Sequence, residues 1–537
     1  MSKGFKRIAI TFLLVHLALS AALALFNPHV HWLDDAYYTM TIARNIAQGD
    51  GISYGGFPTN GFQPLLGFLM APIQGLLGNH PEFCLKISLL TMAFCSTALL
   101  LVILLLTRQL AGEQAAVIAG ALYVANANLL RHALSGLETP LHGLLFWLFV
   151  FLYLRFRENG TIIQQAALGF LLGFTAYARL DAIWLFLAVA ADIAWRCRRQ
   201  PVKIATQGTL FFLPALGLLS PWLIWNWITF GTIMQSPSTF HRWRAFVRQD
   251  IPETAAGMIK FAVLKLTSLG LKLPFEPLFG YEGVTQYLAK KWLGVEKITS
   301  GFLVQLLQTR PLTAALFMGC AALILIMIIV GGKAGLRRLK NLRPLAFLLV
   351  ALAGAALFYP LYLLNYSMRH FFPYSVGMVL VLAAFFSAFA EIKCFQSKAA
   401  RHSIVVFLAV VLALPGLGQW VQKNDPLEIW NETKIIETVT EPGAKIGYTD
   451  CGAFGYYVKG RTIVNLDGIL NFEALAAMKS GDIGDYLVRH NIKYVLYLHN
   501  FTAEYAEQWN NYILPRVEPV APADWIYRLK GIEVPQH

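Results

Sequence analysis

Long apolar runs dominate this sequence and limit what it can fold into. Roughly eleven runs approach the ~20 mostly apolar residues that a helix needs to cross a bilayer. Only 14% of the 537 residues are charged, whereas a soluble globular chain carries about 25%. Inside a bilayer the backbone polar groups must be satisfied within the chain, so such runs favour helices. The sequence therefore predicts a polytopic α-helical membrane protein.

The predicted spans cover the chain up to residue 420. We place them at residues 8–26, 83–107, 113–130, 139–154, 162–178, 182–195, 205–227, 312–332, 344–364, 372–390 and 402–420. No small-residue cleavage site precedes Asn27-Pro28, so the first run predicts an uncleaved span. Residues 63–78 are apolar but interrupted by proline and glycine, which predicts an interfacial or re-entrant segment. A long outer loop is expected at about 230–310.

Lysine and arginine residues set the predicted orientation. Under this assignment the dense basic clusters fall on one side of the membrane, which is then the cytoplasmic side. Up to Gln422 there are 33 basic and 15 acidic residues, and from Lys423 onward 11 and 15. The basic excess thus belongs to the membrane part, where it sets topology and predicts no nucleic acid partner. We place the N-terminus in the cytoplasm and the tail outside a bacterial cytoplasmic membrane.

The tail, residues 421–537, differs in kind from the membrane part, residues 1–420. Residues 445–458 read as a strand, a Gly-rich turn and a further apolar stretch, and residues 461–468 as a strand that ends in a turn. Residues 486–490 read as helix and residues 493–498 as strand. This alternation predicts a small extracytoplasmic (periplasmic) α/β domain. The six cysteines have no CxxC or Cys/His spacing, so neither a disulfide framework nor a cysteine metal site is expected.

Two adjacent carboxylates, Asp34 and Asp35, follow the first span and open a short amphipathic helix that ends near Gly49. Paired carboxylates beside a span are costly unless they face water or a polar substrate. A carboxylate at a helix N-terminus stays ionised, as a general base requires. We expect one to be the catalytic base and favour Asp35; the other would cap the helix or hold a ligand, cation or metal.

Further polar residues come from several predicted outer loops, whereas deep intramembrane charges are few, so chemistry is expected at the outer interface. A phosphate-binding role is predicted for Arg369, His370, Arg131, Arg242 and Arg244, since arginine offers a donor fork that matches phosphate. A substrate-binding role is predicted for Arg44, Asn60, Gln63, His132, Glu138, Arg179, Asp181 and His241. The alternatives are a snorkelling anchor at Arg369-His370, a helix cap at Glu138 and a local Arg179–Asp181 ion pair.

The first outer loop also carries a family resemblance. Asp34-Asp35-Ala-Tyr-Tyr, with Ala43-Arg44-Asn, Gly49-Asp-Gly51 and Asn60-Gly61, resembles the first outer loop of GT-C superfamily glycosyltransferases. The branch containing the mycobacterial terminal arabinofuranosyltransferase is the most similar. Residues 135–139, 178–181, 225–231, 369–373 and 447–468 resemble further patches of that branch.

The resemblance implies a polyprenyl-phosphate sugar donor, a glycan or lipid acceptor, and transfer outside the cytoplasmic membrane. It also implies that Asp34 or Asp35 is the base of an inverting transfer. The leaving phosphate is already anionic, so cations serve it better than an acid. No cofactor is established, and a divalent metal is left open. The alternatives are a lipid or sugar-lipid transporter (a flippase), which predicts paired repeats and broken midplane helices, and an assembly protein whose tail binds a partner.

The basic-residue asymmetry gives a direct test of topology. A periplasmic reporter fused after residue 425 should be active, because the tail is predicted to lie outside. A cytoplasmic reporter fused at the same position should be silent. The reverse pattern of the two reporters would contradict the assignment.

Overall fold

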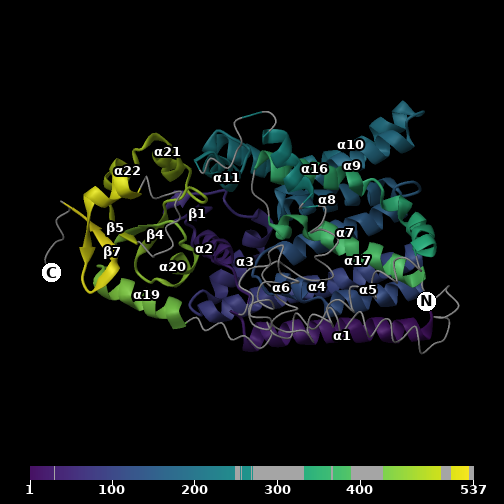
Figure 1. Cartoon of the computed structure of the whole chain (residues 1–537), viewed down its shortest axis with the longest axis horizontal. Coiled ribbons are helices and arrows are strands. Elements are labelled where there is room, and N and C mark those ends of the chain that lie inside the picture. Colours follow the sequence, from purple (N-terminus) through teal and green to yellow (C-terminus); the bar gives the residue numbers. More distant parts are fainter. Residues whose placement is uncertain are drawn as a thin grey trace, which may run out of the picture.

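The computed structural model describes residues 1–29, 31–247, 254, 257–267, 269, 332–363, 367–388, 427–496 and 509–530. In these residues a bundle of helices is joined to a C-terminal α/β unit (Figure 1). The predicted span at 402–420, nearly all of that at 312–332 and much of the outer loop predicted at 230–310 lie outside the described residues.

Apolar helices of membrane-spanning length form the bundle. Among the described residues five qualify: α1 (Lys3–Phe26), α4 (Pro81–Ala111), α7 (Thr139–Phe156), α10 (Pro201–Phe230), and the stretch Arg369–Ser387, which covers most of η4 (Met368–Phe371) and all of α17 (Phe372–Ser387). A sixth span is possible if Gly332–Leu345 and Leu348–Tyr362, which meet at 83°, cross together. This second arm contains α16 (Leu348–Leu357) and the π-helix η3 (Phe358–Tyr362). The prediction of a polytopic helical membrane protein is confirmed.

Shorter helices fill the remaining positions of the bundle: α3 (Pro64–Leu77), α5 (Glu113–Ala125), α6 (Ala127–Ala133), α8 (Ile162–Ala178) and α9 (Ile183–Arg196). The continuous span predicted at 113–130 is wrong. Asn126 is extended at φ −78° and ψ 107°, and its side chain accepts hydrogen bonds from the N–H groups of Asn128 and Leu129. It therefore ends α5 and caps α6, as asparagine favours.

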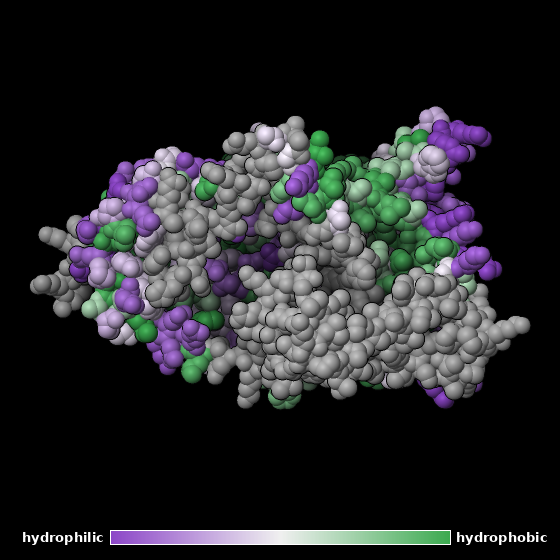
Figure 2. All heavy atoms as spheres, in the orientation of Figure 1, coloured by the Kyte–Doolittle hydropathy of each residue, from purple (hydrophilic) through white to green (hydrophobic). Residues whose placement is uncertain are grey.

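The two ends of the bundle differ in what they carry. The N-terminus lies at the end away from the α/β unit (Figure 1). There Ser2 binds Glu113, which also pairs with Arg108 at 3.3 Å. Among the coloured atoms of the bundle in Figure 2, apolar side chains form a patch between hydrophilic groups at that end and on the tail. The N-terminus and the tail thus lie at opposite ends of the helix bundle.

The tail is built on a five-stranded sheet in the order β4-β3-β5-β7-β6. Its strands are β3 (Lys445–Tyr448), β4 (Thr462–Asn465), β5 (Ile492–Leu496), β6 (Val517–Val520) and β7 (Ala523–Leu529); the first three are parallel, and the last two pair antiparallel. Its helices are α19 (Leu427–Val439), α20 (Gly452–Tyr457), α21 (Phe472–Ser480) and α22 (Ile483–Arg489). The predicted α/β character of the tail is confirmed.

The first outer loop lies between the bundle and the tail. It contains α2 (Asp34–Gln48) and a hairpin of β1 (Ser53–Tyr54) and β2 (Phe57–Pro58). On one side of α2, Tyr37 and Met40 share an apolar cluster with Leu66 of α3 and Leu85 of α4. On another side, Tyr38 and Ile42 join a second cluster.

That second cluster reaches into the tail. It includes Ile446 of β3 and Phe454 of α20, both buried with the α2 side chains. The apolar residues of α2 thus belong both to the cluster with α3 and α4 and to the cluster with the tail. Burial of such side chains is the dominant favourable term in packing of this kind.

The tip of the hairpin offers a test of this packing. Gly55 has φ +60°, and a Cβ there would lie 2.5 Å from the carbonyl oxygen of Ile463 in β4. Gly56 also has positive φ, +84°, but a Cβ there would meet open space. Both alanine variants bear about 1–2 kcal/mol of backbone strain, and only Gly55→Ala adds a clash with the tail.

We therefore expect Gly55→Ala to lower the thermal unfolding midpoint in detergent more than Gly56→Ala does. It should also make the tail more sensitive to limited proteolysis. Equal behaviour of the two variants would show that the hairpin does not depend on its contact with β4.

Candidate active site

An ion pair joins the first outer loop to the turn before α17. The Nη1 atom of Arg369, in η4, donates to the Oδ2 atom of Asp35 at 2.6 Å. The side chains are 28% and 47% exposed, respectively, so both remain open to a ligand. The two residues are 334 positions apart in sequence. The pair brings one predicted base and one predicted phosphate-binding residue into contact.

The predicted capping of α2 by an aspartate is wrong. The N-cap of α2 is Leu33, which makes no side-chain cap hydrogen bond. Asp34 instead accepts from the backbone N–H groups of Gly452 and Ala453, at 2.9 and 2.8 Å. It therefore caps α20 in the tail, since the first N–H groups of a helix need external acceptors. Burial, together with the nearby carboxylate of Asp450, raises the pKa of Asp34.

Arg44, also in α2, contacts the other end of α20. Its Nη1 and Nη2 atoms donate to the carbonyls of Tyr456 and Gly455 at 2.9 and 2.8 Å, and its guanidinium lies over the Tyr456 ring. A carboxylate at the N-terminus and a cation at the C-terminus both complement the dipole of α20. Arg44, predicted to bind substrate, thus fastens the tail to α2.

Two predicted histidines lie near Arg369. The ring of His132 packs edge-on against Phe372 with centroids 5.0 Å apart. Burial is the main cause that lowers the pKa of His132 to about 3, and the positive charges of Arg131 and Arg369 contribute to this shift.

His241, in α11 (Ser236–Val247), has a similar environment. Burial lowers its pKa to about 4, with Arg244 and Arg369 acting in the same direction and Asp35 against them. Both imidazoles are therefore uncharged near neutral pH. Each offers one hydrogen-bond donor and one acceptor beside the charged pair.

Two further arginines that were predicted to bind phosphate, Arg242 and Arg244, lie against aromatic rings. The guanidinium of Arg242 is 4.4 Å from the ring centroid of Tyr362 in η3, and that of Arg244 is 5.9 Å from the ring of Phe240. Such contacts hold a cation without neutralising its charge.

Glu138, Arg179 and Asp181 form a buried network. Arg179 donates to Glu138 Oε1 at 2.5 Å and to Asp181 Oδ2 at 3.1 Å. Tyr359 donates its hydroxyl to Asp181, and the ring of His370 stacks on Tyr359 with centroids 4.2 Å apart. The local ion pair weighed for Arg179 and Asp181 is thus present, and it extends to the residue after Arg369.

Asn60 and Gln63 sit where the first outer loop meets α10 and α11. The fully buried Asn60 donates to Asn226 at 2.8 Å and accepts from the Ser236 N–H at 2.9 Å. Asn60 therefore links three segments of the chain through protein contacts. The Oε1 atom of Gln63 is buried and has no hydrogen-bond partner in the described part of the chain.

Two further carboxylates, to which the sequence analysis assigned no role, lie close to Asp34 and Asp35. Asp450 and Asp467 follow β3 and β4, and both influence the aspartates of α2 or are influenced by them. Burial raises the pKa of Asp467 to about 7, with Asp450 and Asp35 adding to the shift. Their position at the carboxyl ends of adjacent parallel strands was a usable signal. No group of three or more His, Cys, Asp or Glu in the described residues is arranged to hold a metal ion.

The surface between the tail and the bundle is hollowed, and hydrophilic side chains are visible inside the hollow (Figure 2). The Asp35–Arg369 pair joins the first outer loop to η4 of the bundle, and the Asp34 and Arg44 contacts join that loop to the tail. The candidate site therefore draws on both parts of the chain.

We next compared the chain with protein-family models, curated proteins and solved structures. One family model, described as "Domain of unknown function (DUF8728)", matches residues 418–529. No curated protein matches the chain.

Solved structures match most of its length. The Archaeoglobus fulgidus oligosaccharyltransferase tethered to an acceptor peptide aligns over 91% of this chain and 68% of that chain, with 14% identity and a TM-score of 0.54. The same enzyme in complex with Zn and sulfate aligns over 90% and 67%, with 16% identity and a TM-score of 0.52. ArnT from Cupriavidus metallidurans bound to undecaprenyl phosphate aligns over 99% and 98%, with 13% identity and a TM-score of 0.44.

The oligosaccharyltransferase matches support the GT-C fold at large and leave the narrower resemblance to the arabinofuranosyltransferase branch a prediction. The chain is a multi-pass membrane protein with a GT-C fold and a C-terminal α/β region.

Proposed function

We propose that this protein is a glycosyltransferase that moves a sugar from a polyprenyl-phosphate donor to a glycan or lipid acceptor outside the cytoplasm. The observation that carries the proposal is the exposed Asp35–Arg369 pair, a carboxylate and a guanidinium 2.6 Å apart. It is joined by uncharged histidines and lies in a chain with the fold of an oligosaccharyltransferase. These groups suit attack by a hydroxyl with a phosphate leaving.

In the proposed reaction Asp35 takes the proton of the acceptor hydroxyl. The hydroxyl oxygen then forms a bond to the anomeric carbon of the sugar, while the bond between that carbon and the phosphate oxygen breaks. Polyprenyl phosphate leaves with the electron pair, and the configuration at the anomeric carbon inverts. Arg369 stabilises the negative charge on the departing phosphate, which a preorganised cation does well in a site shielded from water.

The resting ion pair suggests an order of events. A phosphate oxygen of the donor would compete with Asp35 for the Arg369 guanidinium, whose fork suits phosphate. Donor binding would then release the Asp35 carboxylate to act as a base. The base would thus be free chiefly when the donor is in place.

The surrounding groups have supporting roles in this proposal. Arg131, Arg242 and Arg244 contribute positive potential toward the phosphate. His132 and His241 can each both donate to and accept from a hydroxyl, because their lowered pKa values keep them uncharged. No step is routed through a metal.

We also propose a division of the chain into two parts. Residues 1–420 would form the membrane catalytic part, and residues 421–537 an extracytoplasmic domain that completes the site. The family match beginning at residue 418 supports this boundary. The active site and the tail would face away from the cytoplasm.

Asparagine variants of the two aspartates should separate their roles. Asp35→Asn keeps the shape of the side chain and removes its basicity, so turnover should fall by about 10²–10⁴-fold. Asp34→Asn still offers one amide oxygen to the α20 N–H groups, so it should retain most activity and lose on the order of 1 kcal/mol of stability. The measurement is release of polyprenyl phosphate by purified protein supplied with polyprenyl-phosphate sugars.

Near-wild-type turnover of Asp35→Asn at saturating donor would remove the main support for the enzyme. The same assay addresses the transporter alternative. A flippase would bind or move the donor without releasing polyprenyl phosphate.

Arginine 369 gives a second test. Arg369→Ala should weaken donor binding and turnover together, because it removes the fork that faces the phosphate. Arg369→Lys should restore activity only in part, since an ammonium lacks the planar fork. Both quantities would be measured as KM for the donor and kcat.

Arg108→Ala is the matched control, since it removes the same charge at the opposite end of the bundle, where Arg108 pairs with Glu113. It should leave donor KM unchanged. Unchanged donor affinity in Arg369→Ala would favour a snorkelling anchor over a phosphate contact.

A further inference from the structure

A basic helical segment lies at the end of the bundle away from the tail. We call Gly332–Leu345, which closes with η2 (Lys340–Leu345), the basic arm. A Cβ on Gly335 would meet the ring of Phe385. Phe385 lies near the end of α17, about 20 Å from η4 at the ordinary helical rise. The basic arm is therefore remote from the candidate site, beside the far ends of the apolar helices.

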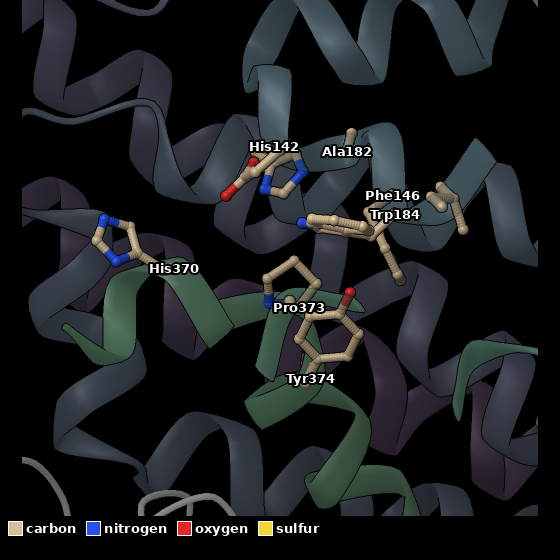
Figure 3. A pocket seen from close by; sticks show the side chains of 10 residues that line it. His142, Phe146, Ala182, Trp184, His370, Pro373 and Tyr374 are labelled. Carbon is tan, nitrogen blue, oxygen red and sulfur yellow. The ribbon is translucent and has the colours of Figure 1, made fainter. Parts of the chain in front are cut away.

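The basic arm runs across the direction of the bundle. It meets the next helical arm, Leu348–Tyr362, at 83°. That second arm packs against α9, and its Ala355 lines a small cavity together with Trp184 of α9 and Tyr374 of α17 (Figure 3). The cavity has room for about one water molecule, so the second arm is packed within the bundle. A helix at 83° to it therefore lies close to the plane of a membrane that the bundle crosses.

The composition of the basic arm is that of a helix at a membrane surface. It contains no acidic residue and five basic ones, Lys333, Arg337, Arg338, Lys340 and Arg343. Leu339 and Leu342 pack against the core of the bundle, whereas Leu336 is 63% exposed. So many charges oppose burial in hydrocarbon. An exposed leucine beside them suits the boundary between lipid headgroups and acyl chains.

Further cations lie close to the basic arm. The ring of Tyr153, near the end of α7, contacts Phe347, which follows the basic arm. The Tyr153 hydroxyl donates to Asp192, near the end of α9. The turn after α9 is therefore beside the basic arm, and it leads through the exposed Arg199 to the exposed Lys203. Positive charge thus comes from two separate segments at this end of the bundle.

Most cations of the basic arm have no acidic partner in the part of the chain that the structure describes. Four exposed side chains form no ion pair or side-chain hydrogen bond there: Lys333, Arg337, Lys340 and Arg343. At the same end of the bundle, by contrast, Arg157 and Arg196 share the carboxylate of Asp192 at 3.3 and 2.7 Å. The basic arm thus presents positive charge that the described residues do not neutralise.

The charges and the neighbouring apolar side chains together specify an occupant. Lysine and arginine side chains only donate hydrogen bonds, and the arginine fork matches phosphate oxygens. Beside them lie the exposed Leu336 and, in the first turn of α16, Leu349, which is 65% exposed. A soluble polyanion would leave both leucines in water. An anionic lipid offers a phosphate to the cations and acyl chains to the leucines, whereas a zwitterionic lipid would add a further cation.

We propose that the basic arm, with the turn after α9, binds the phosphate headgroups of anionic lipids at the end of the bundle away from the tail. The bound lipids would neutralise the exposed cations and hold the basic arm at the membrane surface. The proposal does not depend on glycosyl transfer, because no residue of the basic arm belongs to the candidate site.

Native mass spectrometry of the purified full-length protein in detergent measures this binding. The probes are dioleoyl phosphatidylglycerol and dioleoyl phosphatidylcholine, which carry the same chains on an anionic and a zwitterionic headgroup. We expect phosphatidylglycerol to bind more tightly. In a triple variant of Arg337→Gln, Lys340→Gln and Arg343→Gln, its dissociation constant should rise by about 10- to 100-fold, since each basic residue near the headgroups contributes roughly 5-fold. Binding of phosphatidylcholine should change little.

A triple variant of the tail is the matched control, because it removes the same number of exposed positive charges: Lys434→Gln, Lys459→Gln and Lys479→Gln. It should bind phosphatidylglycerol as wild type does. Arg369→Ala should also retain this binding, which separates the basic arm from the proposed donor site. If the triple variant of the basic arm loses its elution profile or melting midpoint, the single variants Lys340→Gln and Arg343→Gln decide, each with an expected rise of about 5-fold.

Equal affinity of the wild-type protein for the two lipids would overturn the proposal, as would unchanged phosphatidylglycerol binding in the folded variants of the basic arm. An equal loss of binding in the tail control would show that only net charge matters, with the same consequence. Glycerol 1-phosphate has the phosphate without the chains. If it displaced phosphatidylglycerol at an equal concentration, the cations would belong to a soluble phosphate and the lipid assignment would be wrong.

Discussion

The structure depends on the way α2 holds the short helix α20. Asp34 accepts from the first N–H groups of α20, and Arg44 donates to its last carbonyls. Asp34 thus supplies acceptors at one end of α20 and the Arg44 guanidinium supplies donors at the other, so side chains of one helix satisfy the backbone at both ends of another. Because α2 also packs into the bundle, this contact fixes the tail over one end of the helix bundle.

The contact between α2 and α20 also gives the two adjacent aspartates different partners. Successive side chains on a helix point about 100° apart, so Asp34 can face the tail while Asp35 faces η4. The first is used by backbone donors, and the second pairs with Arg369. The network of Glu138, Arg179 and Asp181 reaches the other flank of η4 through Tyr359 and His370. The turn that carries Arg369 is therefore braced on both sides.

The sequence predicts the membrane spans and the local contacts, and it misses other features for physical reasons. Apolar runs predict spans because the bilayer sets their length, and the α2 helix and the Arg179–Asp181 pair are local features. The break at Asn126 was missed because one capping side chain overrides a continuous apolar run. The contact of Asp34 with Gly452 of α20 could not be derived, since the two residues are 418 positions apart. Asp450 and Asp467 could have been noticed from their places after two neighbouring strands, but not their approach to the aspartates of α2.

This separation also bears on how the protein is made. Asp34 reaches Gly452 across 418 positions, and Asp35 reaches Arg369 across 334. Ribosomes add roughly 5–20 residues per second, so the first outer loop would wait some tens of seconds for these partners. Through that interval Asp34, Asp35 and Arg44 are charges without their final contacts. The catalytic constellation proposed here would close only when the end of the chain arrives, so a prematurely terminated chain would insert its early helices and yet carry no completed site.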